Sequence, residues 1–594
     1  MQVLASGIAE RIRDGFADYH ARFAAVTRRA KGRFEAREWA EMRTDLVERI
    51  ELYDVCVNQM QSWLTQVLAE RAQDRALWHR IRNAYAVTVA QLLDHELYKT
   101  YFNTLTRRFF KTHGVDPAIE FIALDIEPTD QITHPVARHS HAIHGELAAV
   151  FERVLAGYGF DVPYAHPRQC AEAMARTVHA RFADWGEPPL VQVELMETVF
   201  YREQRAYLVG RAFGEYLHTP FTIALANGPD GIFVDALLTE RDQVAQLFGY
   251  TRSHFFADLP TVGAAVVFLR SLLPHKPLDE LYTVLGRAKQ GKTERYRAFF
   301  RHLEQHPHEQ FVHADGERGM VMLVFTLPSW PLVFKLIRDR FAYPKETARQ
   351  EVMDKYRIVS RHDRAGRLVD AQEFRFLRFR RDQFAPELLA ELLESCGETV
   401  HLEGEDIVIG HCYIERRLRP LNLYLKEVPA DDALRAVLDY GQAIRDLARS
   451  DIFPGDLLLK NFGVTRNHRA IFYDYDELCL VQDCQFRHMP KPRNEDEELS
   501  HGAWFHVGAT DVFPEQFPQF LGLTEEQRGA LLETHGDIFD VDWWTGLQES
   551  LRRDGPADVN PYPDSARLLG PGADATARIH RSGSPQLPAP TDLG

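Results

Sequence analysis

The sequence predicts an α+β protein in which a helical first half precedes a second half that mixes strands and helices. Apolar residues lie three and four apart up to about residue 305. Short apolar runs separated by turn residues follow from 306 to 413, and helical spacing returns from 431 to 553. The chain of 594 residues is about four times a typical domain of roughly 150 residues, so we expect more than one hydrophobic core.

Residues 1–305 are expected to form an all-helical domain. Apolar positions such as Leu46, Ile50, Tyr53 and Val57 follow helical spacing, and strand-like alternation is scarce in this half. We therefore expect helix-to-helix packing to hold the domain together.

Five short apolar runs predict a five-stranded antiparallel sheet in the second half. The runs are residues 311–313, 320–325, 332–337, 374–380 and 407–413, with one helical stretch, 343–362, between the third and fourth. Together with the helices that follow, they define a second domain, residues 306–553. Seven prolines and five glycines in residues 555–594 predict a flexible tail over 554–594.

Composition and charge exclude several classes of protein. An apolar content of 45% excludes a disordered chain, and a net charge of −16 argues against a general nucleic-acid binder. The six cysteines form no CxxC pair, which is typical of a reducing compartment. The charged first 16 residues do not resemble an export signal, and the longest apolar run, 262–269, is too short to cross a bilayer. We expect a soluble cytoplasmic protein.

The strongest chemical pattern lies in residues 453–477. Asp456 is followed by Asn461 five positions later and by Asp474 thirteen positions after that, which is the spacing of a protein-kinase catalytic loop and metal-binding aspartate. Asp456 would orient the attacking hydroxyl and accept its proton, whereas Asn461 and Asp474 would supply oxygen ligands for Mg²⁺. The alternative is that the two aspartates are ordinary turn and cap residues.

The matching parts of a nucleotide site occur upstream in the expected order. A glycine-containing loop between two predicted strands could close its backbone N–H groups over phosphates, although a simple hairpin turn has the same pattern. This loop consists of Ala314, Asp315, Gly316, Glu317, Arg318, Gly319 and Met320.

Lys335 lies in an apolar strand, where an unpaired ammonium group would be costly to bury. Phosphate oxygens and a glutamate of the next helix, Glu346 or Glu351, would compensate its charge. The alternative is an edge-strand lysine that points to water. The order of loop, lysine, helix and catalytic loop predicts a protein-kinase-like bilobal domain with a sheet lobe and a helical lobe.

Five segments together resemble the isocitrate dehydrogenase kinase/phosphatase family, and the resemblance extends to about residue 553. They are residues 315–321 (DGERGMV), 413–417 (YIERR), 453–456 (FPGD), 460–464 (KNFGV) and 472–477 (FYDYDE). Ordinary kinases carry His-Arg-Asp where this chain has Pro-Gly-Asp, and Asp-Phe-Gly where it has Asp-Tyr-Asp. These differences argue against a general Ser/Thr kinase.

The resemblance implies a bifunctional enzyme that phosphorylates, and so inactivates, a serine of NADP-dependent isocitrate dehydrogenase and also removes that phosphate. Flux between the tricarboxylic acid cycle and the glyoxylate bypass would depend on the balance of the two reactions. The resemblance further implies a regulatory role for the helical residues 1–305, the use of ATP, ADP and Mg²⁺ with Mn²⁺ as an alternative ion, and AMP as an allosteric effector. Whether the chain forms a homodimer is left open.

The resemblance also assigns roles to individual residues. Residues 314–320 and Lys335 would bind ATP, Asp456 would be the kinase base, and Asn461 with Asp474 would hold the metal. It adds Asp370 as a carboxylate needed for the phosphatase reaction, although the sequence alone predicts only a residue at a strand entry. Our hypothesis is that Asp456 directs the serine hydroxyl and Asp370 directs water, with both reactions using one nucleotide pocket.

Two other functions are weighed against this one. A kinase-fold phosphotransferase would act on a small molecule and ignore the dehydrogenase, and an inactive nucleotide-binding scaffold would catalyse nothing. The inactive scaffold is disfavoured because the four polar residues of a kinase site are all present, namely Lys335, Asp456, Asn461 and Asp474.

Other signals are given structural interpretations. His134, His139, His141 and His144 lack the spacing of a zinc site, and we expect them to lie at a polar helix start. The arginines of 375–381 fit strand alternation better than base stacking. The acidic run 495–498 occupies the expected activation segment, before the Phe-Pro-Glu at 513–515, and would help to dock the dehydrogenase.

Overall fold

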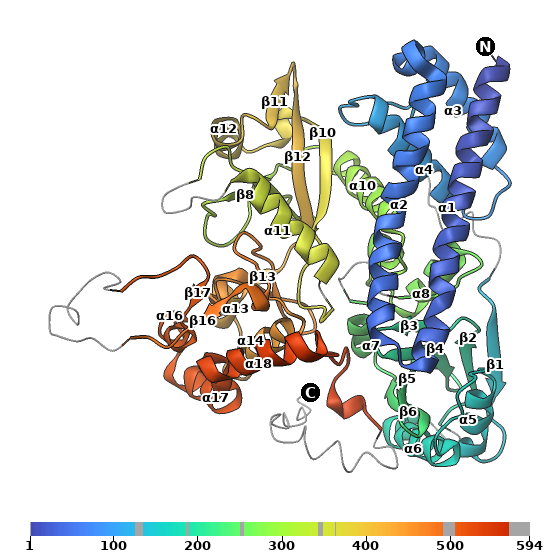
Figure 1. Ribbon diagram of the computed structural model, residues 1–594, viewed down its shortest axis with the longest axis vertical. Coiled ribbons are helices and arrows are strands. Elements are labelled where there is room, and N and C mark those ends of the chain that lie inside the picture. The colour runs from blue at the N-terminus through green and yellow to red at the C-terminus, as the bar shows by residue number, and fades with distance from the viewer. Residues whose placement is uncertain are drawn as a thin grey trace.

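The computed structural model describes residues 2–124, 135–185, 189–249, 255–341, 348–362, 364–490 and 505–568. Long helices and one sheet form the N-terminal half, and a second sheet with a set of shorter helices forms the C-terminal half (Figure 1). The predicted α+β class and bilobal second half are confirmed. Within the described residues, no helix combines the length and apolar character needed to span a membrane.

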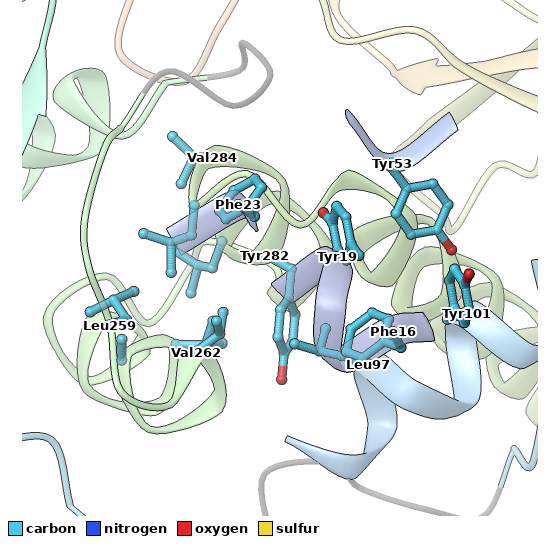
Figure 2. Close-up of a cluster of buried hydrophobic side chains, with 14 of the residues drawn as sticks. Phe16, Tyr19, Phe23, Tyr53, Leu97, Tyr101, Leu259, Val262, Tyr282 and Val284 are labelled. Carbon is cyan, nitrogen blue, oxygen red and sulfur yellow. The ribbon is translucent and has the colours of Figure 1, made fainter. Parts of the chain in front are cut away.

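Four antiparallel helices begin the chain: α1 (Gln2–Ala36), α2 (Trp39–Leu68), α3 (Arg75–Val89) and α4 (His95–Phe109). Their buried faces follow the helical spacing of the sequence and are rich in aromatic residues. Figure 2 shows this core, in which the rings of Tyr19 and Tyr53 meet edge to face with centroids 5.2 Å apart. The bundle also packs against residues 259–284, since Val262 and Tyr282 belong to the same cluster.

A six-stranded sheet interrupts the N-terminal half, so the expectation that this half is all helical is wrong in this part. The strands are β1 (Arg138–Ala142), β2 (Gln192–Met196), β3 (Phe200–Arg202), β4 (Arg205–Phe213), β5 (His218–Gly228) and β6 (Gly231–Leu238). They pair antiparallel in the order β1-β2-β4-β5-β6, with β3 beside β4.

Polar and apolar residues alternate little in these strands because both faces of the sheet are buried. Helices α5 (Leu147–Ala156) and α6 (Pro167–Arg181) share a core with one face. The other face packs against the helical bundle and against residues 244–273. Strands buried on both faces appear as continuous apolar runs, which resemble buried helices in sequence.

Four further helices lead to the C-terminal half: α7 (Arg241–Leu247), α8 (Val262–Leu272), α9 (Leu278–Val284) and α10 (Ala288–Gln305). The last of these, α10, lies between the N-terminal helices and the strands β10 and β12 (Figure 1). Phe299 and Leu303 of α10 are buried in the core of the second sheet, where the rings of Phe299 and Phe334 have centroids 5.1 Å apart. The two halves therefore share a hydrophobic core along this helix.

The second sheet contains the five predicted strands and one more. They are β7 (Val312–His313), β8 (Met322–Thr326), β9 (Leu332–Ile337), β10 (Gln372–Arg380) and β12 (Asp406–Arg416), joined by the short β11 (Val400–Glu403). The order is β10-β12-β9-β8-β7, with β11 paired to β12. With α11 (Arg349–His362) and α12 (Pro386–Ser395), these strands form the sheet lobe.

The helical lobe follows. Its helices are α13 (Leu421–Glu427), α14 (Ala430–Arg449), α16 (Phe517–Phe520), α17 (Glu525–His535) and α18 (Val541–Asp554). Its short strands are β13 (Arg419–Pro420), β14 (Phe462–Val464), β15 (Ala470–Phe472), β16 (Gln485–Phe486) and β17 (Asp511–Val512). Apolar residues of α14, α17 and α18 form one core with the segments that carry the predicted catalytic motif.

The segment after α18 is not wholly a flexible tail, so that prediction is wrong for its first part. The chain returns to the N-terminal sheet, where the ring of Tyr562 is 4% exposed and its hydroxyl contacts Asp235. Arg205 binds Asp235, Asp558, Asn560 and the Tyr562 hydroxyl. This buried polar cluster ties residues 558–568 to β4 and β6, whereas 569–594 lie outside the described residues.

Candidate active site

A cavity of about 890 Å³ lies between the sheet lobe and the helical lobe. Its lining includes all seven residues of the predicted glycine-containing loop, from Ala314 to Met320, and also Lys335. On the other side it includes Asp456, Asn461 and Asp474. The structure thus brings to one cavity the residues that the sequence motifs singled out for nucleotide, metal and proton transfer.

The loop that covers the cavity connects β7 to β8 and adopts a conformation that depends on glycine. Gly316 has φ +115°, in a region that residues with a side chain rarely adopt. The next residue, Glu317, forms an ion pair with Lys460 of the helical lobe at 2.9 Å. Both residues line the cavity, and the Glu317 carboxylate raises the pKa of Lys460 above its usual value. The loop is therefore held against the opposite lobe by charge.

Lys335 is compensated by a partner different from the one expected. Its Nζ lies 2.7 Å from Oε2 of Glu415 and donates a hydrogen bond of 2.6 Å to the carbonyl of Tyr473. Lys335 and Glu415 lie on the neighbouring strands β9 and β12. The expected pairing with Glu351 is wrong, because that residue is exposed on α11 and accepts a hydrogen bond from its own helix start. Glu346 lies outside the described residues.

Glu415 is 1% exposed, so its charge depends on its partners. Burial raises the pKa of its carboxyl group, and the Lys335 ammonium and a hydrogen bond from Tyr356 act in the opposite direction. The nearby Asp370 adds to the upward shift. The charge of the Lys335–Glu415 pair in the cavity wall is therefore affected by Asp370, which does not line the cavity.

The catalytic-loop candidate begins where the chain leaves α14. Phe453 forms two backbone hydrogen bonds with Cys479, so the segments that precede Asp456 and follow Asp474 lie side by side. Asp456 Oδ1 accepts a hydrogen bond of 3.1 Å from the amide of Leu458, which fixes the turn. Asn461 ends the same turn, and its side-chain amide donates to the carbonyl of Asp456 at 3.3 Å.

The second aspartate follows a short hairpin. Strands β14 and β15 pair directly after Asn461, and the amide of Tyr473 donates to the carbonyl of Asn461 at 3.1 Å. This hairpin returns the chain to the cavity, so Asp474 and Asp476 line it together with Asn461. The spacing of thirteen residues between Asn461 and Asp474 is the length of this hairpin.

Asp370 occupies a different position. It lies just before β10, is 9% exposed and is not among the residues that line the cavity. Gln372 donates a hydrogen bond of 3.1 Å to its carboxylate, and Arg295 of α10 lies 3.9 Å away. Arg295 also binds Asp279 of α9 at 2.6 Å. Asp370 is thus part of a buried polar network between the two halves. Its negative charge raises the pKa of Glu415, which does line the cavity.

The donor set of the cavity fits a hard divalent cation. Within the described ranges there is no group of three or more His, Cys, Asp or Glu side chains arranged to hold a metal by themselves. Mg²⁺ does not need such a cage, since it is commonly bound by one or two carboxylates together with phosphate oxygens and water. Asn461, Asp474 and Asp476 offer oxygen ligands of that kind in one place.

The sequence analysis assigned no role to several residues of the site. Glu415, Lys460 and Asp476 were inside the quoted segments but received no role. The acidic residue that closely follows the predicted apolar strand 407–413 was the available signal for Glu415. Nothing in the sequence pattern predicted that Arg416 to Arg419 would also line the cavity.

The histidine run does not begin a helix, so that expectation is wrong, whereas the arginines lie on a strand as expected. His139 and His141 lie on β1, and His144 is exposed after it. Arg375 and Arg378 are exposed on β10 and pair with Glu373 and Asp406. Both His134 and the acidic run 495–498 lie outside the described residues.

Comparison with known proteins adds independent evidence. The model described as "Isocitrate dehydrogenase kinase/phosphatase (AceK), regulatory domain" matches residues 9–307, and that of the corresponding kinase domain matches 309–564. A protein of Xanthomonas euvesicatoria pv. vesicatoria (strain 85-10) named isocitrate dehydrogenase kinase/phosphatase is 58% identical over 565 residues, which cover 95% of this chain and 98% of that protein. One of the same name from Anaeromyxobacter sp. (strain Fw109-5) is 45% identical over 570 residues, covering 96% and 98%. The two family models match both halves of the chain in order, and the relatives match nearly its whole length. The chain therefore belongs to the isocitrate dehydrogenase kinase/phosphatase family.

Proposed function

We propose that this protein is a bifunctional enzyme that phosphorylates a serine of NADP-dependent isocitrate dehydrogenase and removes the same phosphate. The observation that carries the proposal is the convergence of Lys335, Asp456, Asn461 and Asp474 on one cavity beneath a glycine-containing loop. The names of relatives that match nearly the whole chain supply the protein substrate. Flux between the tricarboxylic acid cycle and the glyoxylate bypass would follow from the balance of the two reactions.

The sheet lobe binds the nucleotide. Residues 314–320 bring backbone N–H groups over the cavity, and Lys335 presents an ammonium group that Glu415 holds in place. Its second contact, with the carbonyl of Tyr473, fixes it next to Asp474. A lysine held by two fixed partners gives a phosphate oxygen a preorganised cation, which stabilises transferred charge more than a mobile lysine does.

The helical lobe positions the reacting groups. ATP with its divalent cation supplies the phosphoryl group and the charge that neutralises the β- and γ-phosphates. Asn461 and Asp474 would hold that cation. Asp456, fixed by the Leu458 amide, orients the serine hydroxyl and accepts its proton as the phosphoryl group moves to the serine oxygen.

The reverse reaction uses the same cavity with water as the nucleophile. Asp370 contributes from behind the cavity wall, where its negative charge acts on Glu415 and therefore on the Lys335 pair. Because its side chain does not line the cavity, we propose that its effect on the phosphatase reaction in this state is electrostatic, and that a direct role in orienting water requires the sheet lobe to move.

Incubation with labelled ATP and purified isocitrate dehydrogenase tests the proposal. We expect label on a dehydrogenase serine together with loss of dehydrogenase activity. When ADP replaces ATP, the label should be released and the activity should return. A kinase-fold phosphotransferase would leave the dehydrogenase unlabelled while consuming ATP with a metabolite, and an inactive scaffold would bind ATP without transfer. Either result would contradict the proposal.

Two variants separate the roles of the carboxylates. Asp456→Asn should lower phosphorylation by roughly 10²- to 10⁴-fold, the usual contribution of a positioned general base. Asp370→Ala should lower dephosphorylation much more than phosphorylation. Equal losses of both activities in Asp370→Ala would refute separate roles.

Finer features of the enzyme are proposed on the resemblance. AMP would act as an effector, Mn²⁺ would replace Mg²⁺, and the enzyme would be cytoplasmic. The kinase-to-phosphatase activity ratio measured with and without AMP, and in each metal, tests the first two. Light scattering tests whether the chain forms a homodimer.

The division into a regulatory domain of residues 1–305 and a catalytic domain of 306–553 is also a proposal. It is supported by the cavity and its motifs, which lie in the second part. The contacts of α10 with the sheet lobe give the regulatory part a direct route to the catalytic one.

A further inference from the structure

We propose that Cys479 and Cys484 form a reversible disulfide in the presence of a peroxide, and that this bond lowers catalytic activity. The two Sγ atoms lie 3.5 Å apart on either side of the short 3₁₀ turn Val481–Asp483. A disulfide has an S–S distance of about 2.0 Å, so the sulfurs need to approach by about 1.5 Å. All six cysteines are free thiols in the structure, and the other four are buried.

The pair has the chemistry of a redox site. Cys479 is partly exposed, so a small peroxide can reach it, and Cys484 is close enough to resolve the oxidised sulfur. The Cys484 thiol and the nearby Lys355 lower the pKa of Cys479, which increases its thiolate fraction. Intracellular disulfides are mostly transient and redox-sensing, in agreement with two thiols in contact in the reduced state.

Two electrons pass from the cysteines to the peroxide. The Cys479 thiolate attacks one oxygen of hydrogen peroxide, forming a sulfenic acid and releasing hydroxide. The Cys484 thiol then attacks the sulfenic sulfur, an S–S bond forms, and water leaves. A dithiol such as dithiothreitol reverses the oxidation by exchange.

The position of the pair connects it to the active site. Cys479 is bonded through its backbone to Phe453, three residues before Asp456, at 2.8 and 3.0 Å. It also follows Asp474 and Asp476 by only a few residues. A displacement of Cys479 therefore acts on both segments that carry the proposed catalytic and metal-binding carboxylates.

The opposite side of the bond is fixed. Gln548 of α18 donates hydrogen bonds of 2.8 Å to the carbonyls of Val481 and Cys484. Asp451 accepts hydrogen bonds from the backbone and side chain of Gln482. Since Cys484 is anchored in this way, we propose that closure of the bond displaces Cys479 and the segments bonded to it.

The direct test is to treat the full-length protein with hydrogen peroxide and map its peptides by mass spectrometry without reduction. We expect a peptide that links Cys479 to Cys484, lighter by two hydrogen atoms, and its loss after dithiothreitol. Absence of the linked peptide, or linkage of Cys479 to another cysteine, would overturn the proposal. This readout does not depend on the enzyme's substrate.

The functional test measures activity in the same samples. A displacement of about 1 Å at catalytic groups costs up to roughly 100-fold in rate, so we expect a 10- to 100-fold loss that dithiothreitol restores. Cys484→Ser should keep its activity under conditions that form the bond in the wild type, and Cys479→Ser should do the same. Should one serine variant fail to fold, the other carries the comparison.

Two outcomes separate this inference from the proposed function. If the linked peptide forms while activity is unchanged, the regulatory part of the inference is wrong. If the protein has no activity towards isocitrate dehydrogenase before oxidation, the affinity for a fluorescent ATP analogue, measured before and after peroxide, replaces the activity readout. Unchanged affinity together with an intact disulfide would then refute the effect on the site.

Discussion

The Lys335–Glu415 pair illustrates what single residues can and cannot reveal in sequence. The apolar run around Lys335 correctly indicated that its ammonium group is buried with an anionic partner. The partner was sought in the following helix, whereas it lies 80 positions later on the neighbouring strand. Strand pairing of this kind depends on sheet order, which the local pattern around Lys335 does not contain.

Glu415→Gln should therefore weaken the active site. The change removes the charge that holds Lys335 and leaves the amine with the Tyr473 carbonyl as its fixed partner. We expect kcat/KM for protein phosphorylation to fall roughly 10- to 100-fold, equivalent to about 1.4–3 kcal/mol. Steady-state kinetics with isocitrate dehydrogenase measure it.

Glu351→Gln is the matched control, because Glu351 is exposed on α11 and its carboxylate caps its own helix. Its kinetics should remain close to wild type. An equal loss in the Glu351 variant, or none in the Glu415 variant, would contradict the assignment of Glu415 as the partner.

His535 makes the helical lobe sensitive to acid. The ring is 4% exposed and accepts a hydrogen bond of 3.0 Å at Nδ1 from Arg445. Burial, together with the Arg445 charge, lowers its pKa to about 4. The folded state therefore favours the neutral ring, whereas the unfolded chain binds a proton near pH 6.5.

The stabilising contribution of His535 is complete above pH 6.5 and is lost as the pH falls from 6.5 towards 4. We expect it to amount to roughly 2–3 kcal/mol. His535→Gln should flatten the dependence of the free energy of unfolding on pH in this window, measured by urea denaturation. His144→Gln, at an exposed position, should leave the slope unchanged.

At the scale of elements, the sequence predicted the strands that turn residues separate from one another. Five of the six strands of the second sheet were predicted, since each is bounded by turn residues. The strands of the N-terminal sheet were missed because helices cover both of its faces. The short β11 was also missed, since it depends on the hairpin with β12 more than on its own residues.

Gly455 allows two segments to pack closely, because its lack of a side chain lets the catalytic loop lie against residues 474–477. It has φ +85°, and a Cβ at this position would lie 2.6 Å from the Cβ of Glu477. We expect Gly455→Ala to lower both activities by roughly 100-fold through displacement of Asp456. It should also lower the free energy of unfolding by roughly 1–3 kcal/mol.

Gly522→Ala is the control for the backbone effect. Gly522 has φ +66° and open space around its Cβ position, so strain occurs there without the clash. It should lose some stability and keep its activity. Full activity in Gly455→Ala would show that the close approach to Glu477 has no role.

For the whole molecule, the predicted division into two parts describes the order of the chain better than its packing. The segment that follows α18 was expected to be flexible because of its prolines and glycines. It instead crosses to the N-terminal sheet, because Tyr562 and Arg567 reach the buried Asp235. Composition gave no information on these distant partners.

A pair of truncations tests this crossing. Ending the chain after Leu568 should have little effect on stability, whereas ending it after Asp554 removes the partners of Arg205 other than Asp235. Removing one partner of a buried charge costs about 3–5 kcal/mol, so the shorter chain should have a clearly lower Tm. Equal Tm values would contradict a structural role for residues 555–568.

The sharing of α10 between both halves has a consequence for how such proteins diverge. Phe299 and Leu303 belong by position to the first half and by packing to the sheet of the second. In a chimaera of two such proteins joined at residue 305, α10 of one protein would pack against the second sheet of the other. Substitutions on this helix must therefore be matched across the boundary, so we expect the two halves to be inherited together as one unit.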